Sequence, residues 1–287
     1  MGKLVCLAIF LAADLAGQAG MRYPALPDWA EVELDIAYDR YPETRLDILR
    51  RKEAATARRP GVLVIHGGGW VRGDREGMFK NFCLPYLEKG FVVANVEYRL
   101  AGVAPAPAAV TDVLHAAQWL RKNSKRYRVD ADRIVATGAS AGGHLALMVG
   151  LTPKGAGLGP PAKVAAVINF YGITDVADQL ARPNMREYAV QWVPEQEGRM
   201  ELARRVSPIT WVRRGAPPVL TIHGDEDPTV PYEHGVRLTR LLREAGGDAE
   251  LLSIRGGKHG GFGDEEMARI YREIFRFLEV RGILTAR

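Results

Sequence analysis

Short apolar runs rich in valine and isoleucine recur along the chain, and longer segments with helical periodicity lie between them. The clearest runs cover residues 61–66, 91–98, 134–137, 164–170 and 219–223. Apolar residues predominate in each run, which is typical of strands buried on both faces of a parallel sheet. The pattern therefore predicts a central sheet whose strands are connected by helices.

The segments between these runs predict the helices. Residues 108–125 follow Pro107, which suits a helix start, and they repeat apolar side chains along one helical stripe: Val110, Val113, Leu114, Ala117 and Leu120. Residues 140–151 are small and apolar enough for a buried helix, whereas residues 233–245 and 264–280 are amphipathic. Gly246 and Gly247 end the first of these two amphipathic segments.

Strand–helix alternation over this length predicts an α/β fold, with a mostly parallel, doubly wound sheet and helices on both faces. Residues 32–38 and 45–49 alternate polar and apolar positions, which predicts an antiparallel pair that turns near residues 41–43. The longest stretch outside the alternation is 174–214, where we expect a short lid before the strand at 219–223. No internal repeat or long linker divides residues 20–287, which are therefore predicted to form one domain.

The composition narrows the class of protein without identifying its chemistry. The 287 residues are 47% hydrophobic and 25% charged, which excludes a disordered chain or a disulfide-dense mini-protein. The net charge is +5, but the cations form no dense run interleaved with aromatics, so we expect no nucleic-acid partner. No Cys/His spacing is typical of a zinc site, and we expect no metal.

The beginning of the chain has the features of an export signal. Lys3 precedes an apolar run at residues 4–13, which is too short to span a bilayer but fits a signal-peptide core. Small residues end this segment near Ala19, so residues 1–19 are predicted to be a signal peptide of a periplasmic or secreted protein without stable membrane insertion. Its removal would take Cys6 away and leave Cys83 without a disulfide partner. The alternative is a cytoplasmic protein that starts at Met21.

Ser140 lies in a G-x-S-x-G sequence formed by residues 138–142, between the predicted strand at 134–137 and the helix that follows. In a nucleophile elbow, this strand–turn–helix context forces the serine into a strained conformation and raises its Oγ above the sheet. The pentapeptide alone is weak evidence, because a helix start rich in glycine, alanine and serine has a similar sequence. Ser140 is the candidate nucleophile.

Two further candidates follow strands nearer the C-terminus. Asp227 lies in the loop after 219–223, where a carboxylate could orient a histidine; Asp225 is the competitor and more plausibly shapes the turn. His259 lies on a glycine-rich loop before the last predicted helix, where no core surrounds it. The chain order Ser140, Asp227, His259 is that of α/β-hydrolase triads and is more specific than any of the three alone.

Three consecutive glycines, between His66 and Trp70, follow the strand at 61–66. They allow backbone N–H groups to point at one centre, as an oxyanion hole requires, and we assign Gly68, Gly69 and Ala141 as its donors. Loss of one such donor typically costs about 3 kcal/mol of transition-state stabilisation. A phosphate-binding loop is the alternative, but no Lys-Ser/Thr follows and no G-x-G-x-x-G spacing is present.

The remaining histidines have less specific contexts. His115 and His144 lie within predicted helices and are interpreted as packing or surface residues. His66 and His223 end strands, where we expect them to brace loops through hydrogen bonds, and His234 is expected on the surface of the helix that it begins.

Together, the four motifs resemble those of the α/β-hydrolase superfamily, among its esterases and lipases with an HGGG-type oxyanion loop. The resemblance extends from about residue 45 to residue 277. Trp70, the sequence S-A-G-G-H-L at 140–145 and H-G-D-x-D-x-x-V-P at 223–231 are most similar to the BD-FAE group of acetyl-xylan and feruloyl esterase-like proteins, which bacteria often export. Ala139 departs from hormone-sensitive lipases, which usually carry Asp there, so lipid-type substrates are less expected.

The motifs and the resemblance imply a serine carboxylesterase that hydrolyses short-acyl esters, including acetylated or feruloylated plant polysaccharides or oligosaccharides. Ser140 would attack, His259 would move the proton, Asp227 would orient His259, and no cofactor would be needed. Trp70, Tyr171 and Trp192 are the candidates for the substrate pocket. One alternative is a kynurenine-formamidase-like hydrolase of aryl formamides. Another is a non-catalytic binding module, against which the retention of all three triad residues argues.

Overall fold

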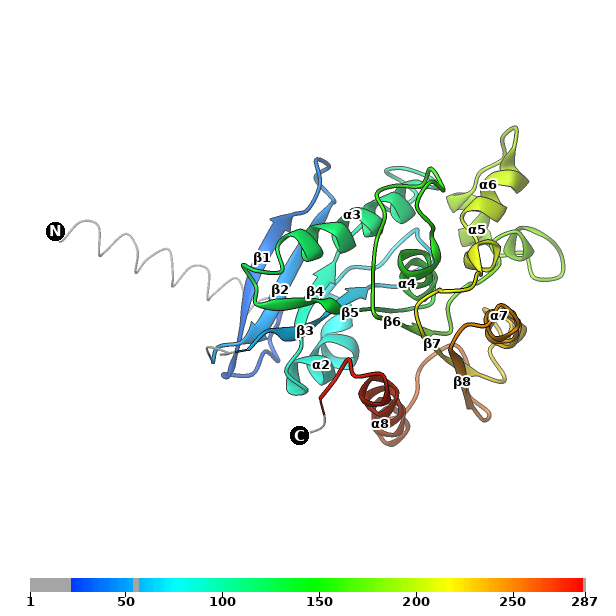
Figure 1. Ribbon diagram of the computed structural model, residues 1–287. Coiled ribbons are helices and arrows are strands. Elements are labelled where there is room, and N and C mark those ends of the chain that lie inside the picture. The colour runs from blue at the N-terminus through cyan, green and yellow to red at the C-terminus, as the bar shows by residue number, and fades with distance from the viewer. Residues whose placement is uncertain (1–21, 54–56, 286–287) are drawn as a thin grey trace.

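The computed structural model describes residues 22–53 and 57–285 (Figure 1). The predicted signal peptide at residues 1–19 lies outside this part of the chain. The described residues form an eight-stranded sheet in the order β1-β2-β4-β3-β5-β6-β7-β8. Between them the eight strands join both halves of the sequence into one sheet.

The strands fall close to the predicted positions. β2 is antiparallel to both β1 and β4, whereas β3 pairs in parallel with β4 and β5, and β5 to β8 continue the parallel pairing. The predicted α/β fold, with its antiparallel pair at the N-terminal edge, is therefore confirmed. The strands are β1 (Ala30–Ala37), β2 (Arg45–Arg51), β3 (Arg59–Ile65), β4 (Val92–Val96), β5 (Val129–Ala139), β6 (Ala166–Phe170), β7 (Val219–Gly224) and β8 (Ala249–Ile254).

The long helices also match their predicted segments: α3 (Ala108–Lys122), α4 (Ala141–Leu151), α7 (Glu233–Glu244) and α8 (Asp264–Val280). Between β3 and β4 the chain forms three short turns of helix that the periodicity did not predict: η1 (Glu76–Met78), η2 (Phe79–Cys83) and α2 (Leu84–Glu88). The expected lid contains η3 (Asp178–Leu180), α5 (Glu187–Trp192), α6 (Arg199–Arg205) and η4 (Pro208–Trp211).

Helices cover both faces of the sheet (Figure 1). Apolar residues of α3, α4 and α7 pack in one core cluster, which also includes residues of the lid. A second cluster joins η2, α2 and α8 to the other face. Burial of apolar surface on both faces explains why the parallel strands read as continuous apolar runs. Among the described residues, no helix has the length and apolar character needed to cross a membrane.

The strand register brings the loops of the predicted site to one edge. Ile65, the last residue of β3, lies beside Val96 of β4 and Gly138 of β5. The loops that begin at residues 66, 97 and 140 therefore leave the sheet side by side. Ligand sites of open α/β sheets lie at this carboxyl edge.

Candidate active site

Ser140 connects β5 to α4 in a conformation that few residues adopt. Its φ of 57° and ψ of −119° place it outside the regions favoured by L-amino acids, as the prediction of a strained elbow requires. The Ser140 N–H donates to the carbonyl of Phe170 at 2.9 Å, which ties the turn to the end of β6. The neighbouring strand therefore helps to hold Ser140 in this strained geometry.

The two glycines of the elbow are required by close backbone contacts. A Cβ on Gly138 would lie 2.5 Å from the Ile65 carbonyl oxygen, and one on Gly142 would lie 2.1 Å from the same atom. Both distances are far below a normal van der Waals contact. The end of β3 therefore approaches the elbow so closely that only glycine fits at positions 138 and 142, two residues before and two residues after Ser140.

The structure brings together the three residues predicted from separate motifs. His259 Nε2 lies 2.9 Å from Ser140 Oγ, and His259 Nδ1 lies 2.7 Å from Asp227 Oδ2. Both distances are those of hydrogen bonds. The imidazole is 20% exposed, whereas the Asp227 carboxylate has no exposed surface. The hydroxyl, the imidazole and the carboxylate thus form a continuous hydrogen-bonded chain, with the carboxylate at its buried end.

Asp227 is held in its ionised form by several donors. Its Oδ1 accepts the N–H groups of Thr229 and Val230 at 2.8 and 3.0 Å, while Oδ2 lies 3.3 Å from His223 Nε2. Burial alone would raise the pKa of Asp227, but the hydrogen bonds from His223 and His259 hold it well below its usual range. An ionised carboxylate can accept the Nδ1–H of His259 and keep Nε2 free to take a proton from Ser140.

Asp225, the competing carboxylate, has a different role. Its Oδ1 accepts the N–H of Gly256 at 2.6 Å, which links the end of β7 to the turn after β8. The structure thus places Asp227, and not Asp225, against His259.

The predicted oxyanion loop folds back against the elbow. Gly68 and Gly69 have φ angles of 108° and 61°, and a Cβ on Gly67 would lie 2.7 Å from the Ala139 carbonyl oxygen and 3.6 Å from Ser140 Cβ. Ala141, the third predicted donor, is the first residue of α4. The three N–H groups assigned from the sequence therefore lie on two segments that contact each other beside Ser140.

Tyr188 of α5 is a site residue that the sequence did not indicate. A Cβ on Gly69 would lie 2.7 Å from Tyr188 Cβ and Cγ, so the tyrosine packs directly on the oxyanion loop. The Tyr188 hydroxyl donates to Gln179, a buried residue of η3. Nearby, Arg186 donates to the carbonyls of Pro228 and Thr229, at 2.7 and 3.0 Å. The lid thus contacts both the oxyanion loop and the loop that carries Asp227.

Two of the three predicted pocket aromatics are core residues. Trp70 and Trp192 have no exposed surface and stack on each other with ring centroids 4.1 Å apart. Trp70 Nε1 also donates to Nδ1 of His144, a residue of α4, at 3.1 Å. The prediction that these rings line a substrate pocket is therefore wrong, because packing between the oxyanion loop and the lid encloses both.

Tyr171, the third predicted pocket aromatic, lies beside the reactive groups. Its ring meets the His259 ring edge-on with centroids 4.8 Å apart, and it also contacts Phe262. A Cβ on Gly260 would lie 2.7 Å from the Tyr171 hydroxyl. Burial raises the pKa of that hydroxyl well above its usual range, so it stays protonated. Tyr171 is thus positioned to support the loop of His259.

The other histidines largely brace loops, with one correction. His66 and His223 make hydrogen bonds at strand ends, as expected. His234 is wrongly predicted as a surface residue: it is buried, accepts the N–H of Thr174 and lies 3.0 Å from Asp178 of the lid. Within residues 22–53 and 57–285, no group of three or more His, Cys, Asp or Glu side chains is placed to hold a metal ion.

A family model for BD-FAE matches residues 46–242, which is more than half of the chain. The chain belongs to the BD-FAE family. The matched segment contains the oxyanion loop, Ser140 and Asp227, and it ends before His259. Membership therefore agrees with the resemblance inferred from the motifs.

Curated relatives of this BD-FAE chain include two esterases of Mycobacterium tuberculosis. Esterase LipC is 30% identical over 78% of this chain and 59% of its own length, and esterase LipQ is 31% identical over 71% of this chain and 51% of its own length. The chain thus spans between half and three-fifths of these relatives.

Solved structures of similar fold are also esterases. A truncated carbohydrate esterase from gut microbiota aligns with a TM-score of 0.77 and 26% identity, over 88% of this chain and 98% of that one. Esterase 2 of Thermogutta terrifontis, in a form phosphorylated by paraoxon, aligns with a TM-score of 0.73 and 26% identity, over 92% of this chain and 99% of that one. The likeness therefore covers almost the whole length of both structures.

Proposed function

We propose that this protein is a serine carboxylesterase that hydrolyses short-acyl carboxylic esters. The observation that carries the proposal is the hydrogen-bonded chain from Ser140 Oγ through His259 to the buried Asp227 carboxylate. The proposal is also supported by the esterases among the relatives and by the BD-FAE family match.

The reaction follows from the roles that these positions permit. Ser140 Oγ attacks the ester carbonyl while His259 Nε2 takes its proton, and Asp227 stabilises the imidazolium that forms. The N–H groups of Gly68, Gly69 and Ala141 stabilise the oxyanion. His259 then protonates the leaving alcohol, and water, activated by the same imidazole, releases the acid from Ser140. These steps require neither a metal nor an organic cofactor.

The decisive experiment replaces the nucleophile. Ser140→Ala is expected to lower kcat for p-nitrophenyl acetate by about 10⁵–10⁶-fold and to abolish labelling by a fluorophosphonate probe. The phosphorylated form of the Thermogutta esterase supports the choice of such a probe. Ser124→Ala is a matched control, because this buried serine lies in the turn after α3, and it should keep both activity and labelling. Full activity in Ser140→Ala would remove the proposed nucleophile.

For the alcohol part of the substrate, we propose acetylated or feruloylated plant polysaccharides or oligosaccharides. The support is the carbohydrate esterase among the similar structures and the family to which the chain belongs. Rates should be compared over acetyl, butyryl, octanoyl and feruloyl esters, with acetylated xylan and N-formylkynurenine alongside. A preference for acetyl or feruloyl esters supports the proposal, whereas a higher kcat/KM for N-formylkynurenine would favour the formamidase alternative.

We also propose that the protein is exported from the cytoplasm. The charged residue and apolar run before residue 19 support a cleaved signal peptide. N-terminal sequencing of the protein from cells that express the whole gene tests it directly. A mature chain that starts close to residue 20 supports export, and an intact chain in the cytoplasm contradicts it.

A further inference from the structure

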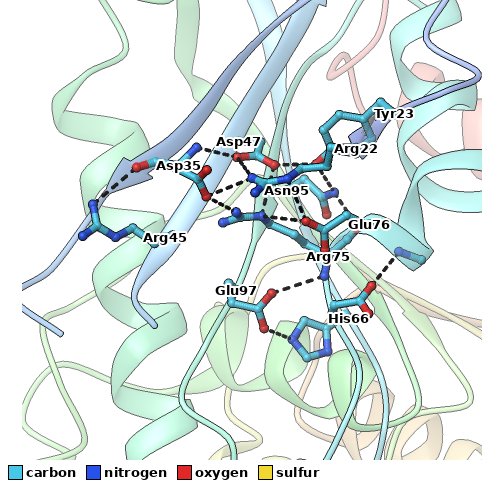
Figure 2. Close-up of polar contacts among 12 residues, drawn as sticks. Arg22, Tyr23, Asp35, Arg45, Asp47, His66, Arg75, Glu76, Asn95 and Glu97 are labelled. Atoms are coloured by element: carbon cyan, nitrogen blue, oxygen red, sulfur yellow. Dashed lines mark hydrogen bonds and ion pairs between the residues drawn. The ribbon is translucent and has the colours of Figure 1, made fainter. Parts of the chain in front are cut away.

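A cluster of charged side chains lies behind the oxyanion loop and includes the first described residues of the chain (Figure 2). At its centre, Asp47 of β2 has no exposed surface, and its Oδ2 lies 3.0 Å from Arg75 Nε. Arg75 follows the oxyanion loop and is itself 6% exposed. A buried carboxylate is costly unless charges and donors surround it, so the contacts of Asp47 are expected to be strongly constrained.

Arg22 and Tyr23 supply two of these contacts from the N-terminal side. The Tyr23 hydroxyl donates to Asp47 Oδ2 at 2.6 Å, and Arg22 Nη1 lies 3.5 Å from Asp47 Oδ1. Arg22 also pairs with Asp35 of β1 at 2.9 Å and with Glu76 of η1 at 2.9 Å. Burial and the Asp47 carboxylate raise the pKa of Tyr23 well above its usual range, so its hydroxyl remains a donor.

The same cluster reaches the oxyanion loop at both of its ends. The backbone N–H of Arg75 donates to one oxygen of Glu97 at 3.3 Å, and the other oxygen lies 2.8 Å from His66 Nε2. His66 Nδ1 lies 2.8 Å from the carbonyl oxygen of Gly67, directly before the predicted oxyanion donors. Glu97 therefore bridges the first and last residues of the segment 66–75 (Figure 2).

Asn95 ties the two parts of the cluster together. This buried residue of β4 donates to the Arg75 carbonyl at 2.7 Å and lies 3.1 Å from the Tyr23 hydroxyl. The contacts of the N-terminal residues thus continue through Asp47, Asn95 and Arg75 to the loop. Among the described residues, no hydrogen bond or ion pair joins these side chains to Ser140 or His259, so the contacts of the cluster act on the position of the loop.

We propose that Arg22 and Tyr23 are positioning residues of the oxyanion hole, which they hold in place through Asp47 and Arg75. The inference rests on the proposed esterase function, and it adds an element that lies outside the family match at residues 46–242. When these contacts are present, the N–H groups of Gly68 and Gly69 are already oriented before substrate binds. When they are lost, part of the binding free energy of the transition state is used to order the loop.

The test compares Arg22→Met and Tyr23→Phe with Arg50→Met. Tyr23→Phe removes only the hydroxyl and keeps the ring that packs on Phe79 with centroids 5.2 Å apart. Arg50 is the control, because it pairs with Glu31 between β2 and β1 but has no contact with Arg75. Arg22→Lys serves as the conservative variant that keeps a positive charge near Asp35 and Asp47.

The expected result is a selective loss of kcat. Arg22→Met and Tyr23→Phe should lower kcat for p-nitrophenyl acetate by about three- to tenfold with KM nearly unchanged, less than the roughly 10²–10³-fold loss caused by removing a whole oxyanion donor. Arg22→Lys should recover part of this loss, and Arg50→Met should match the wild type. Because unfolded protein also lowers the apparent kcat without changing KM, kcat is calculated per active site, counted by complete labelling with the fluorophosphonate probe.

Hydrogen–deuterium exchange of residues 66–75 gives a second readout that needs no activity. Both variants should exchange faster than the wild type in this segment, whereas Arg50→Met should not. Unchanged kcat and exchange in both variants, or the same changes in Arg50→Met, would overturn the positioning role. If the wild type itself hydrolyses no ester, the proposed function fails and the exchange experiment alone decides whether Arg22 and Tyr23 hold the loop.

Discussion

His144 links stability to pH through one buried imidazole. It lies in α4, one turn after Ser140, and has no exposed surface. Its Nδ1 accepts the Trp70 indole N–H at 3.1 Å, so the proton is on Nε2, which donates to the Val206 carbonyl at 2.7 Å. A second proton on Nδ1 would face the indole N–H. Burial lowers the pKa of His144 from 6.5 to about 4, although the Val206 carbonyl opposes this shift.

The direction of the effect follows from which state binds the proton. Between pH 6.5 and about 4, the unfolded chain protonates His144 and the folded chain does not. The free energy of unfolding therefore falls as the pH is lowered through this range, by up to about 1.4 kcal/mol per pH unit. From pH 7.5 to pH 5.0 the loss from this residue amounts to about 2 kcal/mol, and it levels off below the folded-state pKa.

His144→Gln separates this contribution from those of the other ionisable groups. The glutamine amide retains one acceptor and one donor group but does not titrate. The free energy of unfolding is measured by urea denaturation of both proteins at pH 7.5 and pH 5.0, with equal m-values as a check on two-state behaviour. The wild type should lose about 2 kcal/mol more than the variant. Equal losses in both proteins would refute the assignment of a neutral, buried His144.

Three further predictions test the site and its surroundings. Asp227→Asn should lower kcat by about 10³–10⁴-fold, because the amide no longer selects the His259 tautomer, whereas Asp225→Asn should keep a kcat close to that of the wild type. A larger loss of kcat in Asp225→Asn than in Asp227→Asn, measured in steady-state assays, would contradict the assignment. Gly68→Ala should lower both kcat and Tm, since the new Cβ would lie 1.9 Å from the Arg72 carbonyl oxygen at a φ of 108°. A variant with the kcat and the Tm of the wild type would exclude this backbone geometry. Trp192→Ala should lower the free energy of unfolding, measured by urea denaturation, by about 3–5 kcal/mol and leave KM unchanged, because the ring belongs to the core. A large change in KM without a loss of stability would instead support the predicted contact of Trp192 with substrate.

The candidate triad could be predicted because each member lies in a short motif at the end of a strand. The order Ser140, Asp227, His259 needed no knowledge of how distant segments pack, since parallel strands place their carboxyl ends on one edge. The structure adds the reason for preferring Asp227 over Asp225, which is the direction of each carboxylate and could not be read from the loop sequence.

The wrong predictions for the substrate pocket concern residues whose environment is decided by the packing of segments that are distant in the sequence. Trp70 and Trp192 are separated by more than a hundred positions in the sequence, and their mutual stacking, which buries both, has no local signal. The same holds for Tyr188 against Gly69 and for Asp47 against Arg75. The sequence shows that these positions carry aromatic, glycine or charged residues, but the tertiary fold decides which residues they contact.

Helix α4, which begins at the elbow, has a consequence for synthesis of the chain. All of its residues, 141–151, are buried, and it packs against β6 and η4 as well as against earlier elements. Those two partners leave the ribosome later, η4 on the order of sixty residues after the helix, which takes several seconds at about 5–20 residues per second. During that interval α4 can pack on β3, β5 and α3 but lacks β6 and η4, so part of its largely apolar surface stays uncovered, and we expect the yield of folded protein to respond to the supply of chaperones.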